Sequence, residues 1–170
     1  MSRPSAKEFG PQHQNYINYT SGKDYSILVQ QYHERITESW SAIPLEKINY
    51  AYGPDKWTIK QMFQHVIDTE RIFAYRALVI ARNEPASLLG FDENEYAKNA
   101  TAVNRNWKDM LTEWRVVRHS TNLLFASFTE DQMKALGTAS GQAISVNALG
   151  FIIFGHALHH LHVLKERYDI

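Results

Sequence analysis

Residues 58–82 read TIKQMFQHVIDTERIFAYRALVIAR, and their apolar side chains recur every three or four positions. That spacing places them on one face of an α-helix. Thr58 followed by Gln61 predicts a capping box where the helix begins. Asn83 and Pro85 predict where it ends. This stretch indicates the fold class, because three other segments of the chain share its periodicity.

The other three helices are expected at about residues 22–42, 101–127 and 145–168. Pro44 ends the first of them, and Ser145 is a good N-cap for the last. Four amphipathic helices without a strand pattern predict an all-α protein, a four-helix bundle. The segments between them are longer than the roughly 2–8 residues usual in bundles, which indicates either a crossover connection or a loop that shapes a pocket. The best candidate is the segment from Pro85 to Asn99.

The gross composition bounds the organisation and the partners of the chain. Its 170 residues predict one bundle domain over residues 21–170, preceded by a flexible N-terminal tail over residues 1–20. Lys plus Arg and Asp plus Glu both number 18, so no long-range field draws in nucleic acid, and we expect no nucleic-acid partner. Without an apolar run of about 18 residues we expect no membrane span, and without an apolar N-terminal signal we expect a cytoplasmic protein.

Histidine spacing gives the strongest chemical signal. Four of the eight histidines are His156, His159, His160 and His162. At about 100° per residue, His156 and His160 fall on the apolar stripe of the last helix, whereas the other two point away. Two imidazoles at i and i+4 can share a metal ion. A structural pair held only by hydrogen bonds is the alternative, unless a third ligand exists.

His65 is the natural third ligand. It lies on the shoulder of the second helix's apolar stripe, a position that lines a cleft between helices. Metal sites in bundles are built from side chains on facing helices. The candidate metal ligands are therefore His65, His156 and His160. The remaining candidates, His13, His33 and His119, are expected not to bind metal.

With no cysteine in the chain, a metal would be held by nitrogen or oxygen. Three neutral histidines leave open positions on a divalent ion, the pattern of catalytic sites, and zinc or nickel suits them. Such an ion lowers the pKa of a bound water or thiol. Asp68 could orient a ligand from outside the site, or it could be a solvated charge. Glu70 and Arg71 are expected to be surface charges.

Two runs, KWTIKQMFQHVIDTE at 56–70 and HALHH at 156–160, resemble the second-helix and fourth-helix signatures of the DinB/YfiT-like family. GFDE at 90–93 is similar to a loop of its close relatives. The resemblance implies an up-down-down-up bundle, often a homodimer, with a metal on His65, His156 and His160. Some branches of the family are metal-dependent transferases that join a low-molecular-weight thiol to an electrophile, and others have been described as metal-dependent hydrolases.

We therefore expect a divalent-metal-binding protein that acts as an enzyme on a small-molecule substrate, as a thiol S-transferase or a hydrolase. The alternatives are a non-catalytic protein that binds metal or a small ligand, and a structural module without metal. A thiol cosubstrate would need a neighbouring site for its charged groups. Arg76, Arg105 or Arg115 could supply that site, and the sequence does not choose among them.

Overall fold

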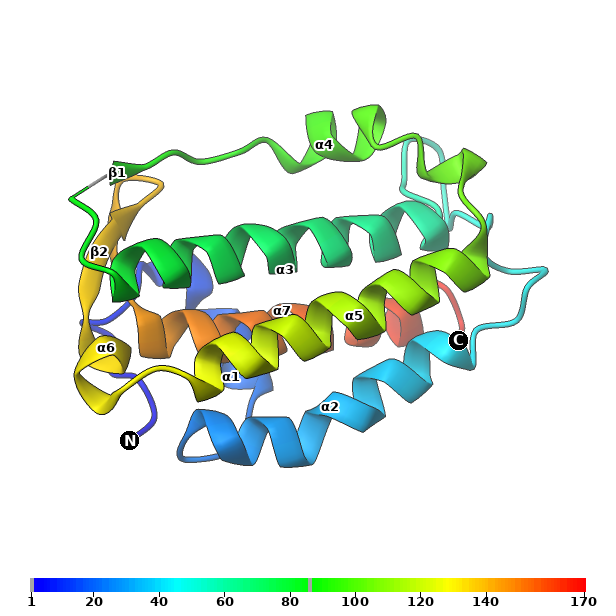
Figure 1. The fold of residues 1–170 in the computed structure, drawn as a ribbon. Helices are drawn as coiled ribbons and strands as arrows, with labels where there is room; N and C mark the ends of the chain where they lie inside the picture. The colour runs from blue at the N-terminus through cyan, green and yellow to red at the C-terminus, as the bar shows by residue number, and fades with distance from the viewer. Residues whose placement is uncertain (1, 86) are drawn as a thin grey trace.

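The computed structural model describes residues 2–85 and 87–170. Four long helices form the bundle: α2 (Tyr25–Ser41), α3 (Ile59–Ala81), α5 (Trp107–Ala126) and α7 (Val146–Arg167). In Figure 1, α2 and α7 run in one direction and α3 and α5 in the other, which gives the order up-down-down-up. The expected all-α, four-helix bundle is confirmed.

The up-down-down-up order explains the longest connection. α3 and α5 run parallel, so the chain must return along the bundle before α5 begins, a distance of roughly 35 Å for a helix of this length. The return path carries β1 (Ser87–Leu88), α4 (Glu93–Asn99) and η2 (Ala102–Asn104). It runs beside α3 and supplies part of the wall of a cleft.

A β-hairpin precedes α7 where the sequence showed no strand pattern. After α6 (Glu130–Lys134), β2 (Leu136–Ala139) pairs antiparallel with β3 (Gln142–Ser145), and β1 adds parallel to β2. Both turn residues, Ser140 and Gly141, have positive φ, of 52° and 74°. Two such residues form the tight turn that suits a hairpin. The strands are too short for alternation to reveal them.

The N-terminal segment is not the flexible tail that the sequence suggested. It forms η1 (Pro11–His13) and α1 (Gln14–Tyr19), which packs along α7, and Ile17 is buried. The backbones meet because position 155 is glycine: a Cβ there would lie 1.9 Å from the carbonyl oxygen of Tyr16. The folded unit therefore includes α1 as well as residues 21–170.

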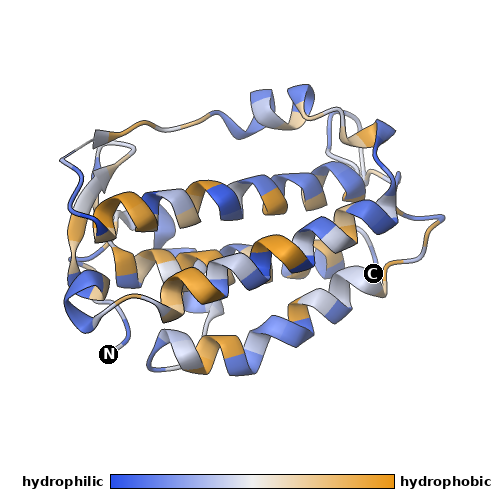
Figure 2. Ribbon diagram, in the orientation of Figure 1, coloured by the Kyte–Doolittle hydropathy of each residue, from blue (hydrophilic) through white to orange (hydrophobic). Residues whose placement is uncertain are grey.

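α7 is the central helix. Apolar and hydrophilic residues alternate along the ribbons of α3 and α5 (Figure 2), as burial of one face of each helix requires. In α7, by contrast, every residue from Val146 to Leu158 is buried, because α1, α2 and α3 all pack against it. Among the described residues, no helix combines the length and the hydropathy that a bilayer span requires.

One pair of charges lies inside the bundle. Glu70, expected on the surface, is buried on α3, and Arg118 of α5 reaches its carboxylate at 2.6 Å. The Arg118 guanidinium also lies 4.7 Å from the Trp114 ring centre. Helical periodicity cannot reveal a partner on another helix 48 residues later, such as Arg118. The prediction that Glu70 lies on the surface was wrong for this reason. Arg71 does lie near the surface, where it pairs with Glu113 at 2.7 Å.

Candidate metal centre

The three candidate ligands meet where α3 packs against α7. His65 projects from α3, and His156 and His160 project from successive turns of α7. Nε2 of His156 lies 3.0 Å from Nε2 of His65 and 3.1 Å from Nε2 of His160. The structure thus brings His65 into contact with a histidine that lies 91 residues later in the sequence.

Burial keeps these imidazoles neutral. It lowers the pKa of His65 to about 4, and it holds the pKa values of His156 and His160 well below the usual 6.5. Neighbouring imidazoles lower them further, since positive charges so close would repel. Neutral imidazole is the form that binds metal, so the site is ready for a cation near neutral pH.

The geometry fits a small divalent ion. Ligand nitrogens at about 2.0–2.1 Å from a tetrahedral ion lie roughly 3.3 Å from one another. The observed separations of 3.0 and 3.1 Å differ from that value by a few tenths of an ångström. The ligand atoms of all three residues lie within 4.8 Å of one another. Small side-chain adjustments would therefore place all three around one ion.

The triad opens into a cavity of about 450 Å³, here called the histidine cleft. Aromatic rings supply much of its wall, and five non-aromatic residues, Gln12, Thr69, Arg76, Glu93 and Ser140, add polar or charged groups. Besides the triad, the cleft is lined by Gln12, His13, Tyr16, Trp57, Thr69, Phe73, Arg76, Phe91, Glu93, Ser140 and His159.

α1 forms one side of the cleft, a feature that the sequence analysis missed. The Tyr16 ring meets the His156 ring edge-on, with centres 5.3 Å apart. His159, next to the ligand pair, lies between Tyr16 and Tyr19, with ring centres 5.6 and 5.5 Å away. The sequence pattern that could have revealed α1 is the group of large apolar and aromatic side chains Tyr16, Ile17 and Tyr19. A short helix can place these three side chains against a neighbouring helix.

Asp68, for which the sequence left open a ligand-orienting role and a solvated charge, has its polar contacts away from the triad. Its Oδ1 accepts a hydrogen bond from Nε2 of Gln64 at 2.9 Å and lies 3.8 Å from Arg71. The Thr69 hydroxyl instead lies 3.4 Å from Nδ1 of His65. Three residues after His65, Asp68 is turned about 60° around the helix, whereas the fourth residue stays nearly in line.

The other histidines occupy different surroundings. His13 lines the histidine cleft without joining the triad, and its ring centre is 6.4 Å from that of Phe73. Nδ1 of His33 is 3.2 Å from Nδ2 of Asn122, and His119 is exposed on α5. None of the three belongs to the histidine cluster that, among the described residues, could hold a metal ion.

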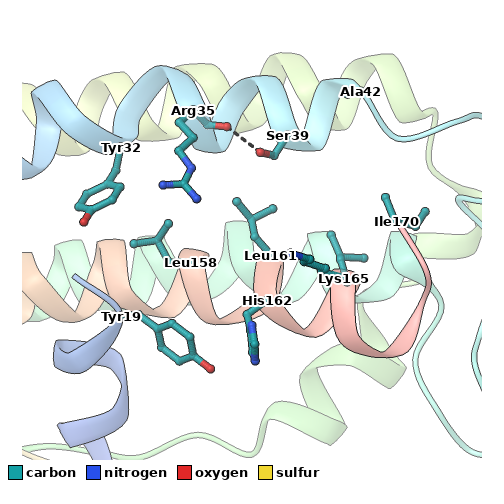
Figure 3. Close-up of a pocket in the computed structure, with 11 residues that line it drawn as sticks. Tyr19, Tyr32, Arg35, Ser39, Ala42, Leu158, Leu161, His162, Lys165 and Ile170 are labelled. Atoms are coloured by element: carbon teal, nitrogen blue, oxygen red, sulfur yellow. Dashed lines mark hydrogen bonds between the residues drawn. The ribbon is translucent and has the colours of Figure 1, made fainter. Parts of the chain in front are cut away.

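A second cavity, about 550 Å³ in volume, lies between α2 and α7. Figure 3 shows the Arg35 side chain directed from α2 toward Leu158 and Leu161 of α7. This cavity also contains His162 and Lys165 but none of the three clustered histidines. Although this cavity is larger, the described residues that line it include no cluster of side chains that could hold a metal ion. The histidine cleft is therefore the candidate site.

Comparisons with known proteins agree with the fold. YfiT from Bacillus subtilis, described as a probable metal-dependent hydrolase with an unusual four-helix bundle topology, superposes with a TM-score of 0.67 at 16% identity. The match covers 98% of this chain and 93% of YfiT. No curated protein matches the chain. The sequence profile of the DinB superfamily, however, matches residues 28–164, and the chain therefore belongs to the DinB superfamily.

Proposed function

We propose that this protein binds one divalent metal ion, zinc or nickel, through Nε2 of His65, His156 and His160. The convergence of these three neutral, buried nitrogens at the base of a cleft carries the proposal. Both metals accept imidazole ligands. When bound by three uncharged ligands, such an ion keeps its full charge and lowers the pKa of a water or thiol nucleophile.

We further propose that the protein is an enzyme for a small molecule. The histidine cleft, at about 450 Å³, falls within the roughly 300–1,000 Å³ of small-molecule sites. Trp57, Tyr16 and Phe73 would contact apolar parts of a substrate and exclude water from the triad. The description of YfiT supports a hydrolase, and the family resemblance of the helix signatures supports a thiol S-transferase that uses a low-molecular-weight thiol.

Metal removal and restoration test the enzyme hypothesis. We expect the zinc-loaded or nickel-loaded protein either to hydrolyse p-nitrophenyl esters or to transfer cysteine to monochlorobimane. Chelation should stop this turnover, and the same metal should restore it. Tight metal binding with no turnover on either type of substrate would instead assign a non-catalytic metal-binding or ligand-binding role.

The ligand assignment has its own test. H160A should lose the metal while keeping the helical circular-dichroism signal, because the other core contacts of α7 remain. H162A is the matched control, since His162 is an exposed histidine on the same helix. Full metal stoichiometry in H160A would refute the assignment. The homodimer expected from the resemblance stays a prediction, which light scattering on the purified protein checks.

A further inference from the structure

Arg76 is a buried cation without an acidic partner. Only 4% of its surface is exposed, and it lines the histidine cleft. Its Nη2 donates hydrogen bonds to the Leu89 carbonyl oxygen at 2.8 Å and to Oγ of Ser140 at 3.2 Å. Both acceptors are uncharged. Within residues 2–85 and 87–170, no carboxylate forms an ion pair with this guanidinium.

The other arginines show how unusual this is. The bundle's other buried arginine, Arg118, has the Glu70 carboxylate at 2.6 Å. Arg105 pairs with Glu113 at 2.5 Å, and exposed Arg115 donates to Oγ of Ser41 at 3.0 Å. Burying a charge without a counter-ion is costly. Burial accordingly lowers the pKa of Arg76, and an anion in the cleft would relieve that cost.

Helix geometry places Arg76 and the triad at two ends of one cleft. Arg76 follows His65 by eleven residues, about three turns, so both lie on nearly the same face of α3. Side chains of a helix tilt toward its N-terminus, which brings the guanidinium back toward His65. Its Cζ lies 5.7 Å from the Phe73 ring centre, and that ring centre lies 6.1 Å from the His156 ring centre. The guanidinium carbon is therefore within about 12 Å of the His156 ring.

We propose that Arg76 is the anion-binding subsite of the histidine cleft, and that the substrate is a small molecule with a carboxylate or phosphate group. The anion contacts the guanidinium, an apolar middle part packs against Phe73 and Tyr16, and the reacting group lies at the triad. The N–H groups on Nε and Nη1, which have no partner among the described residues, would supply the contacts. The assignment rests on the proposed function and identifies its substrate class.

Ligand binding to the wild-type protein tests this inference without a mutation. The probes are 3-phenylpropionate, 2-phenylethyl phosphate and the neutral 3-phenylpropionamide, and titration calorimetry measures their affinities. We expect at least one of the two anions to bind about tenfold or more tightly than the amide. The anion that binds more tightly shows whether the substrate carries a carboxylate or a phosphate. Equal affinities for all three would overturn the proposal and leave Arg76 as a clamp between Leu89 and Ser140.

Two controls separate the subsite from the metal. The titrations are run on zinc-loaded and on chelated protein, because an anion could bind the ion directly. A preference that persists after chelation belongs to the protein, and it would survive even if the metal-dependent activity proved wrong. A preference that vanishes on chelation would contradict the assignment.

Variants then locate the preference on one side chain. R76Q should abolish it, and R76K should keep part of it, since lysine retains the charge but loses the planar fork. R115Q, which changes an exposed arginine, should leave it intact. Metal content and thermal unfolding of each variant are measured alongside. An anion preference that survives in R76Q would refute the role of Arg76, and should R76Q fail to fold, R76K and the wild-type comparison still decide.

Discussion

Gly155→Ala should destabilise the protein by pushing α1 off α7. Position 155 lies inside α7, where replacing glycine by alanine normally stabilises a helix by about 0.5–1 kcal/mol. Here the added Cβ would lie 1.9 Å from the carbonyl oxygen, 2.4 Å from the carbonyl carbon and 2.9 Å from Cα of Tyr16. These are backbone atoms, so no side-chain rotation can relieve the contact.

The steric term should exceed the helix-propensity gain. Ordinary van der Waals contact needs roughly 3.4 Å or more, so α1 must move by more than an ångström. Overpacking of this kind costs about 1–3 kcal/mol and occasionally more. A contact of 1.9 Å to backbone belongs in the upper part of that range, about 2–3 kcal/mol. After the propensity gain is subtracted, a net loss of about 1–2.5 kcal/mol remains, which corresponds to a Tm lower by roughly 2–10 °C for a chain of this size.

Thermal unfolding followed by circular dichroism checks this result. The matched control is Gly53→Ala, since the nearest atom to a Cβ there is Cγ of Lys56 at 3.7 Å. The control should stay within about 2 °C of the wild type, because surface changes usually alter stability by no more than about 0.5 kcal/mol. A Tm for Gly155→Ala at or above the wild-type value would mean that propensity outweighs the clash, and the packing of α1 on α7 would be refuted.

Two further predictions concern buried charge. R118M should lower the free energy of unfolding, measured in urea, by about 3–5 kcal/mol, because it leaves the Glu70 carboxylate buried without its partner. The double variant E70L/R118M should regain most of that loss. A loss below about 1 kcal/mol in R118M would contradict the buried ion pair. Chelated protein should become less stable as the pH falls from about 6.5 toward 4. The unfolded chain's histidines take up protons near pH 6.5, while burial holds the folded pKa of His65 at about 4 and those of His156 and His160 well below 6.5. For His65 alone the loss amounts to roughly 3 kcal/mol: this stability is fully present above pH 6.5 and is gone below about pH 4. Urea titrations across that window would show no slope if the three side chains were solvated.

The sequence predicted the parts of the fold that depend on local periodicity. The start of α3 is capped by Thr58 and Gln61, as the motif indicated, and the structure shows the complete capping box. Ser145 caps α7 by accepting from the backbone N–H of Ala148. The spacing of His156 and His160, together with the shoulder position of His65, was enough to choose the three histidines that the fold brings together.

Other features depend on contacts between distant segments, which periodicity does not reveal. The packing of α1 on α7 follows from the absence of a side chain at Gly155. The burial of Glu70 follows from Arg118 on another helix. Arg76 could be named as a candidate from its charge, but only the approach of Leu89 and Ser140 shows that it lies in the histidine cleft rather than in solvent.

The central claim is that one divalent ion lies on Nε2 of His65, His156 and His160. Its most direct test is a crystal structure of zinc-loaded protein with anomalous diffraction recorded on both sides of the zinc absorption edge. We predict one anomalous peak per chain, within about 2.0–2.1 Å of all three nitrogens. Zinc-loaded crystals with no peak at the triad, and three imidazoles joined only by hydrogen bonds, would contradict the claim.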